Sequence, residues 1–352
     1  MAPVIAELRR HPQACESRVC FTGQHRELVE PVLRLFEIGV DVDLAVMRPD
    51  QDLAALTGRL FGRLAPVVRE LTPDWVLAQG DTTSVMVAAL VAFYEHVRFG
   101  HVEAGLRTGD LEQPFPEELN RRVADLVAAA HFAPTERSRQ ALLREGIPRG
   151  RIHLCGNTVV DALLAAAALP YDWAAGPLRD IPAAGQMVLI TGHRRESFGR
   201  PFEQICRAIR QLAGLFTDHR FVYPVHLNPN VRRPVHALLS GLPNLHLIEP
   251  LDYLSLVNLM RRARLILTDS GGIQEEAPTF GVPVLVMREV TERPEAVEAG
   301  LARLVGSDKE RIVREAARIL TAAREPSAAG PIENPYGDGR AAARIVSRLL
   351  AE

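Results

Sequence analysis

The chain has 352 residues, of which 47% are hydrophobic and 24% are charged, and its formal net charge is -2 at pH 7. This composition is typical of an ordinary folded protein and argues against a protein that binds nucleic acid through its overall charge. The length exceeds the size at which a single hydrophobic core usually stops growing. We therefore expect two domains with a cleft between them.

The sequence also bears on location and redox state. No apolar run approaches the ~20 residues of a membrane-spanning helix, and the N-terminus lacks a basic region followed by a signal-like apolar core. The four cysteines, Cys15, Cys20, Cys155 and Cys206, show neither paired metal-ligand spacing nor a redox C-x-x-C pair. We expect a cytoplasmic protein with reduced thiols and with no membrane or nucleic-acid partner.

The first half of the chain begins with a helix-like segment at residues 3–10 and then alternates short apolar runs with longer helical patterns. This alternation is typical of βαβ units and predicts a parallel sheet. A Rossmann-like domain normally begins on a buried strand and a ligand-facing loop, so the sequence predicts that the first strand of this domain is missing. The predicted strands are residues 19–22, 75–79, 99–102, 130–132 and 152–154.

The second half has the same organisation. Residues 168–186 contain three prolines and two glycines, which favours a linker. A last helix is expected at about 339–351. We therefore expect an N-terminal Rossmann-like domain of residues 1–167 plus 339–352, with the last helix packing back on it, and a C-terminal Rossmann-like domain of residues 168–338. The predicted strands of the second series are residues 187–191, 221–224, 245–248, 265–268, 282–287 and 304–305.

A glycine turn, Ser270-Gly271-Gly272, links one of these strands to the start of a helix. The glycines let the backbone approach a ligand closely, and the free N–H groups of a first helical turn favour a phosphate. Glu275 and Glu276 follow a few residues later. They can be dipole-compensating caps, or one of them can accept hydrogen bonds from ribose hydroxyls.

Three carboxylates follow strands of the first half. The ligand-facing loops of a doubly wound sheet lie at the carboxyl ends of its strands, so Asp81, Glu103 and Glu117 can converge on one rim. Each also has a structural alternative: Asp81 can cap the next helix, Glu103 can pair with Arg107, and Glu117 can pair with Arg121 one helical turn later. Together they suggest acid/base chemistry, because crowding pushes the pKa values of carboxylates apart.

Two loops of the second half carry imidazole and guanidinium groups. His193 and Arg194 follow a strand, and arginines beside a histidine favour contact with an anion such as a diphosphate. His226 lies in another strand-end loop whose role the chemistry alone leaves open. No His or Cys spacing predicts a catalytic metal, and the motifs of NAD and ATP sites are missing, so we expect no cofactor.

These motifs together resemble the non-hydrolysing UDP-N-acetylglucosamine 2-epimerases, and the resemblance spans nearly the whole chain. The resemblance implies the two-domain fold of the GT-B glycosyltransferases, with the active site in the cleft between two Rossmann-like domains. It also implies a cytoplasmic homodimer that needs no redox cofactor. The matching segments are residues 80–83, 101–108, 116–121, 156–158, 193–196, 223–226, 268–278, 291–295 and 334–339.

The implied activity is the reversible conversion of UDP-N-acetylglucosamine to UDP-N-acetylmannosamine, through elimination of UDP and an enzyme-bound 2-acetamidoglucal. The resemblance implies the following candidate catalytic residues: Asp81, Glu103, Glu117 and His193. It implies the following candidate substrate contacts, with Glu276 toward the ribose: Arg121, Arg194, Ser270, Gly271, Gly272 and Glu276.

Two departures from the family pattern leave alternatives open. The family's first strand and its Gly-Thr-Arg-Pro-Glu-Ala-Ile-Lys loop are not found ahead of residues 1–4, so an impaired UDP-sugar-binding protein is one alternative. A hydrolysing epimerase or a glycosyltransferase is another, against which the three rim carboxylates argue. Some members carry an activating second substrate site; Gln24, Gln51 and His226 resemble its contacts, whereas Glu27 and Asp50 do not.

Overall fold

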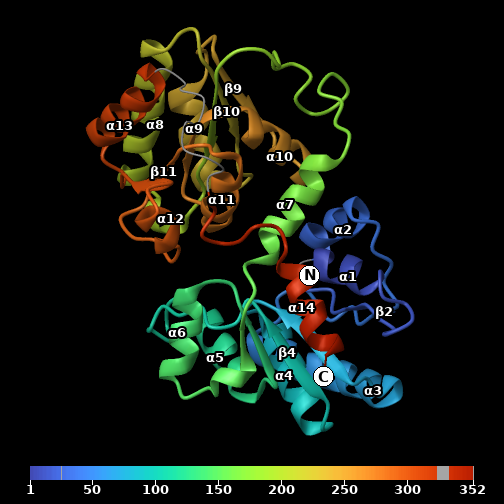
Figure 1. The fold of residues 1–352 in the computed structure, drawn as a ribbon. Helices are drawn as coiled ribbons and strands as arrows, with labels where there is room; N and C mark the ends of the chain where they lie inside the picture. Colours follow the sequence, from blue (N-terminus) through green and yellow to red (C-terminus); the bar gives the residue numbers. More distant parts are fainter. Residues whose placement is uncertain (25, 323–332, 352) are drawn as a thin grey trace. The chain divides into compact units, whose positions relative to one another are not determined.

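The computed structural model describes residues 1–24, 26–322 and 333–351. The chain divides into two compact units, called unit 1 and unit 2 below. Unit 1 comprises Met1–Ala162 and Tyr336–Glu352, and unit 2 comprises Leu163–Pro335. The first border falls inside helix α7 (Thr158–Ala168). Each unit is an α/β structure built on parallel strands (Figure 1).

Unit 1 holds a four-stranded parallel sheet in the order β3-β4-β5-β6, and a separate parallel pair, β1-β2. In the described part of unit 1, this pair is not hydrogen-bonded to the larger sheet. The elements are α1 (Ala2–Leu8), β1 (Cys20–Phe21), α2 (Arg26–Leu35), β2 (Val42–Asp43), α3 (Leu53–Leu71), β3 (Trp75–Gln79), α4 (Thr83–Tyr94), β4 (Arg98–Val102), α5 (Glu117–Val127), β5 (Ala130–Ala133), α6 (Glu136–Arg144), the 3-10 helix η1 (Arg149–Arg151), β6 (Ile152–Leu154), the start of α7, and α14 (Ala341–Leu350).

Helices form in unit 1 where apolar residues recur at helical spacing. The buried face of α3 is Leu56, Leu60, Leu64 and Val68, four residues apart each time, and it packs on α4. The last helix, α14, lies against α1, and both contribute to one apolar cluster with β4 and β5. Residues from the two ends of the chain therefore stabilise the same sheet.

Unit 2 is a six-stranded parallel sheet in the order β12-β11-β10-β7-β8-β9. Helices α8, α9 and α13 share one apolar cluster with its strands, and α10 lies on the opposite side (Figure 1). The elements are β7 (Met187–Thr191), η2 (Arg195–Ser197), α8 (Arg200–Leu215), β8 (Arg220–Pro224), α9 (Pro229–Leu239), β9 (Leu245–Ile248), α10 (Tyr253–Arg262), β10 (Ala263–Thr268), α11 (Gly271–Glu276), η3 (Ala277–Phe280), β11 (Val284–Val286), α12 (Pro294–Glu298), β12 (Ala302–Leu304) and α13 (Lys309–Thr321).

The strand order of unit 2 reverses direction between β7 and β10. Strands β8 and β9 follow on one side of this pair, and β11 and β12 follow on the other. In a doubly wound sheet, ligands bind outside the carboxyl ends of the strands at such a switch point. Thr191 and Thr268 are register partners at the ends of β7 and β10. The loops that follow them are therefore where a ligand of unit 2 is expected.

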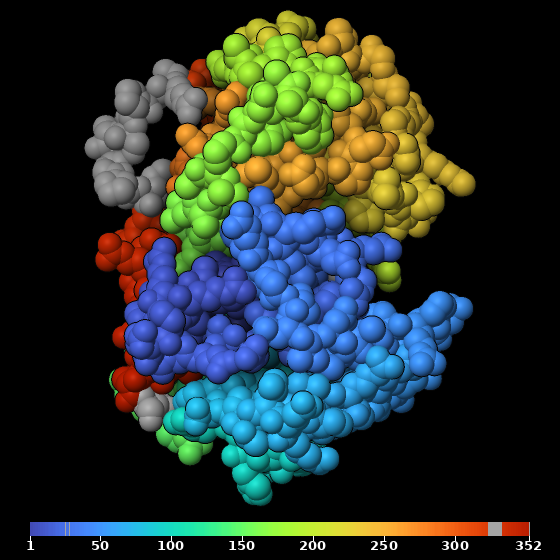
Figure 2. All heavy atoms as spheres, turned by 90° about the vertical axis from the view of Figure 1, so that its right-hand side faces the viewer, coloured from blue at the N-terminus to red at the C-terminus, as the bar shows by residue number. Residues whose placement is uncertain are grey.

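The predicted strands are confirmed within one or two residues, and β2 is a strand that the sequence analysis missed. The predicted linker, residues 168–186, falls within unit 2 and packs on it. Trp173 donates its indole N–H to the carbonyl of Ile181 at 2.6 Å, and Arg262 of α10 lies over the Trp173 ring. Figure 2 shows this yellow-green segment covering the orange α10 region. None of the helices in the described ranges has the length and apolar character needed to cross a membrane.

Candidate functional site

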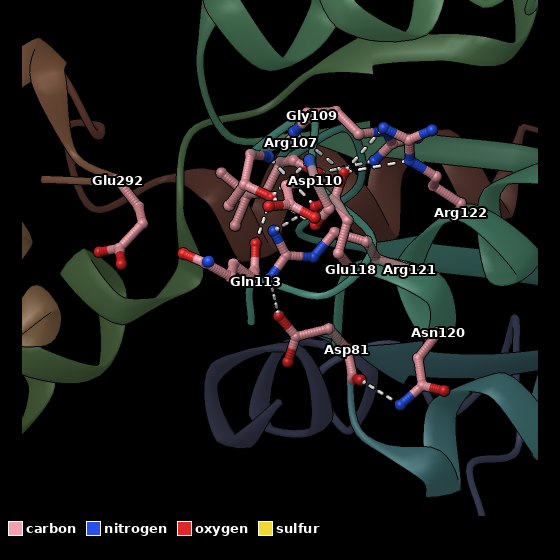
Figure 3. A network of polar contacts seen from close by, with 12 residues as sticks. Asp81, Arg107, Gly109, Asp110, Gln113, Glu118, Asn120, Arg121, Arg122 and Glu292 are labelled. Carbon is pink, nitrogen blue, oxygen red and sulfur yellow. Dashed lines mark hydrogen bonds and ion pairs between the residues drawn. The ribbon is translucent and has the colours of Figure 1, made fainter. Parts of the chain in front are cut away.

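The loop after β3 is held by two successive residues of α5. Arg121 pairs with the carboxylate of Asp81, and the Asn120 side chain donates to the Asp81 carbonyl at 2.9 Å (Figure 3). Asp81 does not cap α4, whose N-cap is Thr82 and which has no side-chain capping bond. The helix-cap alternative for Asp81 is therefore wrong, and Asp81 is instead joined to a residue 40 positions later.

Beside this pair lies a carboxylate that the sequence analysis missed. Glu118 is fully buried and accepts from the backbone N–H groups of Thr108 and Gly109 at 3.1 and 3.3 Å. It also accepts from Arg121 at 3.3 Å and from Arg122 at 3.0 Å. Glu118 thereby anchors the loop before α5. The sequence did carry a signal for this anchor: Glu118 stands three and four residues before Arg121 and Arg122, and residues at this spacing share one helix face.

Glu117, the neighbouring residue, has a different environment. It is the first residue of α5, is half-buried, and has no hydrogen bond or ion pair to any residue that the structure describes. The alternative of an ion pair with Arg121 is wrong, because that guanidinium is engaged by Asp81 and Glu118. A half-buried carboxylate without an internal partner is available to a ligand.

Glu103 follows β4 in a left-handed backbone conformation, with φ at 67°. A non-glycine residue there costs on the order of 1–3 kcal/mol, and such residues cluster at functional sites. Its carboxylate accepts from the side chain of Gln79 at 3.3 Å and from that of Asn157 at 3.5 Å. A Cβ placed on Gly80 would lie 3.8 Å from Glu103 Oε2, so Glu103 borders the loop that carries Asp81.

The alternative of a Glu103–Arg107 ion pair is wrong, because Arg107 pairs with Asp125 and Glu145, each at 2.7 Å. Asp125 also contacts His101 at 2.6 Å, and both residues are buried. Burial by itself would lower the pKa of His101, but the Asp125 carboxylate outweighs burial and raises it. For Asp125, burial opposes ionisation, yet His101 and Arg107 lower its pKa to about 2.

This His101–Asp125 pair fixes the two loops that carry candidate carboxylates. His101 Nε2 lies 2.8 Å from the carbonyl oxygen of Gly80, next to Asp81. Asp125 accepts from the N–H of Gly105, two residues after Glu103, at 3.2 Å. Neither residue was predicted: a histidine among the apolar residues of a strand is typical of an ordinary core position, and Asp125 lies far along the chain in α5.

In unit 2, the switch-point loops are joined through one buried carboxylate. Asp269 Oδ2 accepts from the backbone N–H groups of His193 and Arg194 at 2.7 and 2.8 Å. The His193 ring stacks on His226, with centroids 5.2 Å apart. Burial lowers the pKa of His193; Asp269 opposes this shift, and the neighbouring His226 and Arg194 add to it.

The predicted glycine turn is confirmed at the start of α11. Ser270 is its N-cap residue, without a side-chain capping bond, and Gly271 and Gly272 begin the helix. A Cβ on Gly271 would lie 3.7 Å from Nη2 of Arg194, so this guanidinium borders the turn. Backbone N–H groups and an arginine therefore occur together, as an anion requires.

The two glutamates of α11 are the last two residues of this six-residue helix, so they are not N-terminal caps. Glu275 pairs with Arg293, and its carbonyl accepts from Asn334 at 2.9 Å. Glu276 accepts from the Tyr253 hydroxyl at 2.8 Å. Burial raises the pKa of Glu276 to about 7, against the effect of the Tyr253 bond. In the described chain, Glu275 has an arginine partner, whereas the buried charge of Glu276 has no arginine or lysine partner.

The three residues that resemble an activator site, Gln24, Gln51 and His226, each have a partner within their own unit. Gln24 accepts from the Ser84 hydroxyl at 2.6 Å, and Gln51 accepts from Arg59 at 2.8 Å, so both amide oxygens are already used. His226 stacks on His193 and thus belongs to the switch-point loops of unit 2. Over the described ranges, no cluster of three or more His, Cys, Asp or Glu residues could hold a metal ion.

Comparison with known proteins gives a consistent result. The family model described as UDP-N-acetylglucosamine 2-epimerase matches residues 6–350. The UDP-N-acetylglucosamine 2-epimerase of Escherichia coli strain K12 is 52% identical over 363 residues, which is 99% of this chain and 94% of that protein.

Two solved structures agree with this match. The UDP-GlcNAc 2-epimerase from Neisseria meningitidis bound to UDP-GlcNAc has a TM-score of 0.88 at 45% identity, and the alignment covers 100% of this chain and 96% of that one. The Methanocaldococcus jannaschii enzyme in complex with UDP-GlcNAc and UDP has a TM-score of 0.81 at 31% identity, with the same coverage. The two-domain α/β architecture is of the GT-B type.

Proposed function

The chain belongs to the UDP-N-acetylglucosamine 2-epimerase family, and we propose that it interconverts UDP-N-acetylglucosamine and UDP-N-acetylmannosamine without a redox cofactor. One observation of the site carries this proposal. Asp81, Glu103 and Glu117 lie at loop ends, and none is engaged by the structural partner that its position in the sequence suggested. Carboxylates placed in this way are suited to transfer protons to and from a sugar carbon.

The reaction needs two linked events. The C2 proton of the sugar is not next to a carbonyl group and is poorly acidic, so its removal is coupled to breaking of the C1–O bond. A carboxylate takes the proton, a C1=C2 double bond forms, and UDP leaves with the bonding electrons, giving 2-acetamidoglucal. Protonation of C2 from the opposite face and return of UDP to C1 then complete the epimerisation.

The residues of unit 1 are assigned to the proton transfers. Glu117 has no partner among the described residues, and Asp81 is oriented by Arg121. Glu103 borders Gly80 and is held by two amide side chains. We assign the acid and base roles to these three carboxylates as a set.

The residues of unit 2 are assigned to the nucleotide. Arg194 borders Gly271, and with His193, Ser270 and Gly272 it supplies positive charge and N–H groups to the diphosphate. Such groups stabilise the negative charge that develops as UDP departs. Glu276 accepts hydrogen bonds from the ribose hydroxyls. It is available for this role because it forms no ion pair with an arginine of the described chain.

The test is incubation of the protein with UDP-N-acetylglucosamine in deuterated water, followed by proton NMR. We expect UDP-N-acetylmannosamine with deuterium at C2. Epimerised sugar that retains its C2 proton would rule out the proton-transfer mechanism. Release of free N-acetylmannosamine and UDP would identify a hydrolysing enzyme, and binding of UDP without turnover would identify an impaired binding protein.

We further propose, from the family resemblance, that the chain acts as a homodimer in the cytoplasm. Sedimentation analysis of the purified protein measures the first property, and fractionation of the native cells measures the second. Activation by a second substrate molecule, for which Gln24, Gln51 and His226 are the candidates, would appear as a sigmoidal dependence of rate on substrate concentration.

A further inference from the structure

Asp269 is a buried carboxylate that the assignments above leave without a role. It is 1% exposed and directly follows β10. Its Oδ2 atom accepts two backbone hydrogen bonds from the loop after β7, whereas its Oδ1 atom has no hydrogen-bond partner among the residues that the structure describes. A buried acceptor without a donor is costly, so this orphaned oxygen requires an explanation.

The imidazole of His193 is a candidate donor to this oxygen. His193 Nδ1 lies 3.6 Å from Asp269 Oδ1, which is slightly beyond hydrogen-bond range, and the imidazole is partly exposed, with 40% of the side chain accessible. The two loops are fixed by their strands, because Thr191 and Thr268 are register partners whose hydroxyls lie 2.6 Å apart. A small rotation of the imidazole therefore suffices to make the bond.

We propose that Asp269 is a positioning residue for His193: its Oδ1 atom accepts the Nδ1–H of the imidazole and directs Nε2 toward the diphosphate of the substrate. This inference rests on the proposed function for the identity of the anion. A carboxylate behind a functional histidine fixes which ring nitrogen carries the proton, and it stabilises the imidazolium when the other nitrogen must donate.

The charges around His193 make this support necessary. Burial, the stacked His226 and the neighbouring Arg194 all lower the pKa of His193, and Asp269 is the acidic group that opposes them. A bound diphosphate adds negative charge on the Nε2 side, which favours the imidazolium. Binding of UDP is therefore coupled to uptake of a proton by His193, with Asp269 completing the charge balance.

Two substitutions at Asp269 separate this role from that of a loop clamp. In Asp269→Asn, the amide oxygen can still accept both backbone N–H groups, but an NH₂ group replaces the oxygen that faces His193 Nδ1. In Asp269→Ala, the clamp and the imidazole contact are both lost. A clamp alone predicts that the asparagine variant behaves as wild type, whereas a positioning role predicts that the asparagine variant is already defective.

The first measurement is ¹⁵N NMR of histidine-labelled protein without ligand, with the His193 signals assigned by comparison with His193→Gln. We expect the Nδ1–H tautomer in the wild type and the Nε2–H tautomer in Asp269→Asn. Tyr223→Phe is the matched control, because it removes the hydrogen bond of 3.0 Å to the Gly192 carbonyl without touching the imidazole. The tautomer should not change in this control.

The second measurement is calorimetric UDP affinity between pH 5 and pH 9. UDP affinity should fall as the pH rises through the His193 pKa. In Asp269→Asn, loss of the opposite charge should shift this transition to lower pH by about one unit or more, so that binding above the wild-type transition is about tenfold weaker. An unchanged tautomer and pH profile in Asp269→Asn would overturn the inference. If the wild type binds no UDP, the proposed function fails, and the ligand-free tautomer still decides the role of Asp269.

Discussion

Four buried carboxylates, two in each unit, differ in the kind of partner that they have. In unit 1, Glu118 and Asp125 each pair with at least one arginine. In unit 2, Asp269 and Glu276 rest on backbone N–H groups and on a tyrosine hydroxyl. A positive partner favours ionisation far more strongly than a neutral donor does.

The contrast is clearest for two carboxylates that are almost completely buried. His101 and Arg107 overcome burial and lower the pKa of Asp125 to about 2. The Tyr253 bond is too weak to overcome burial, so the pKa of Glu276 rises to about 7. The pKa of a buried carboxylate therefore depends on whether its partners carry positive charge, as for Asp125, or are neutral donors, as for Glu276. Four substitutions test this difference.

Asp125→Asn should have the largest effect on stability, because it leaves His101 buried without its counter-charge and removes one of the two carboxylates that pair with Arg107. We expect the free energy of unfolding at pH 7, measured with urea, to fall by about 3–5 kcal/mol. The stability that Asp125 supplies in the wild type should be complete above its ordinary pKa of 3.8 and should be lost as the pH falls through about 2.

Glu145→Gln is the matched control, since Glu145 pairs with the same Arg107 but its side chain is 38% exposed. A surface partner of this kind contributes about 1 kcal/mol or less. Equal losses in the two variants would mean that unit 1 does not depend on its buried charges as argued.

Glu117→Gln should cut turnover by at least ~100-fold, or about 2.7 kcal/mol of barrier, because it removes a proton-transferring group. Because Glu117 has no partner among the described residues, the free energy of unfolding should change by less than about 0.5 kcal/mol, and UDP affinity by a few-fold at most. Asp81→Asn should lose turnover similarly but also stability, since it breaks the pair with Arg121. Calorimetry showing that Glu117→Gln abolishes UDP binding would reassign Glu117 to recognition.

Glu276→Ala should act mainly on UDP affinity. Loss of a buried, charged hydrogen bond should weaken binding by roughly 1.5–3 kcal/mol, measured by calorimetry at pH 8, with a smaller change in turnover. Glu275→Gln is the control on the same helix: it breaks the ion pair with Arg293 and should reduce stability more than affinity. The reverse pattern in the two variants would exchange their roles.

Tyr253→Phe should have the smallest effect, about 0.5–1.5 kcal/mol in UDP affinity near pH 7. The Tyr253 bond lowers the pKa of Glu276, so its loss should raise that pKa. As the pH is lowered, protonation of Glu276 and the resulting loss of UDP affinity should therefore begin at a higher pH than in the wild type. Identical pH profiles of affinity in the two proteins would contradict this account.

The same carboxylate makes folding stability depend on pH. The folded-state pKa of Glu276, about 7, exceeds its ordinary value of 4.5. The stability linked to Glu276 is therefore complete below pH 4.5 and is lost as the pH rises through about 7.

The sequence by itself determined nearly all of the strands and the loops in which the candidate site residues lie. Apolar runs of a few residues between helical patterns predict parallel strands, and the strand at 75–79 is found at its predicted bounds. The turn at Ser270-Gly271-Gly272 was predicted for a local reason, because glycines after a strand and before a helix expose backbone N–H groups. The strand β2 was missed although the sequence carried a signal for it, because Val40, Val42 and Leu44 alternate with Asp41 and Asp43 in the pattern of a half-buried strand.

Only the tertiary structure decided which charged groups meet. Asp81 pairs with Arg121 and not with its own helix, Arg107 pairs with Asp125 and not with Glu103, and Asp269 holds a loop 76 residues away. The physical reason is that periodicity and turn chemistry are local properties of the chain. The partners of a buried charge, in contrast, are set by which strands lie side by side and which loop ends their parallel alignment brings within hydrogen-bond distance.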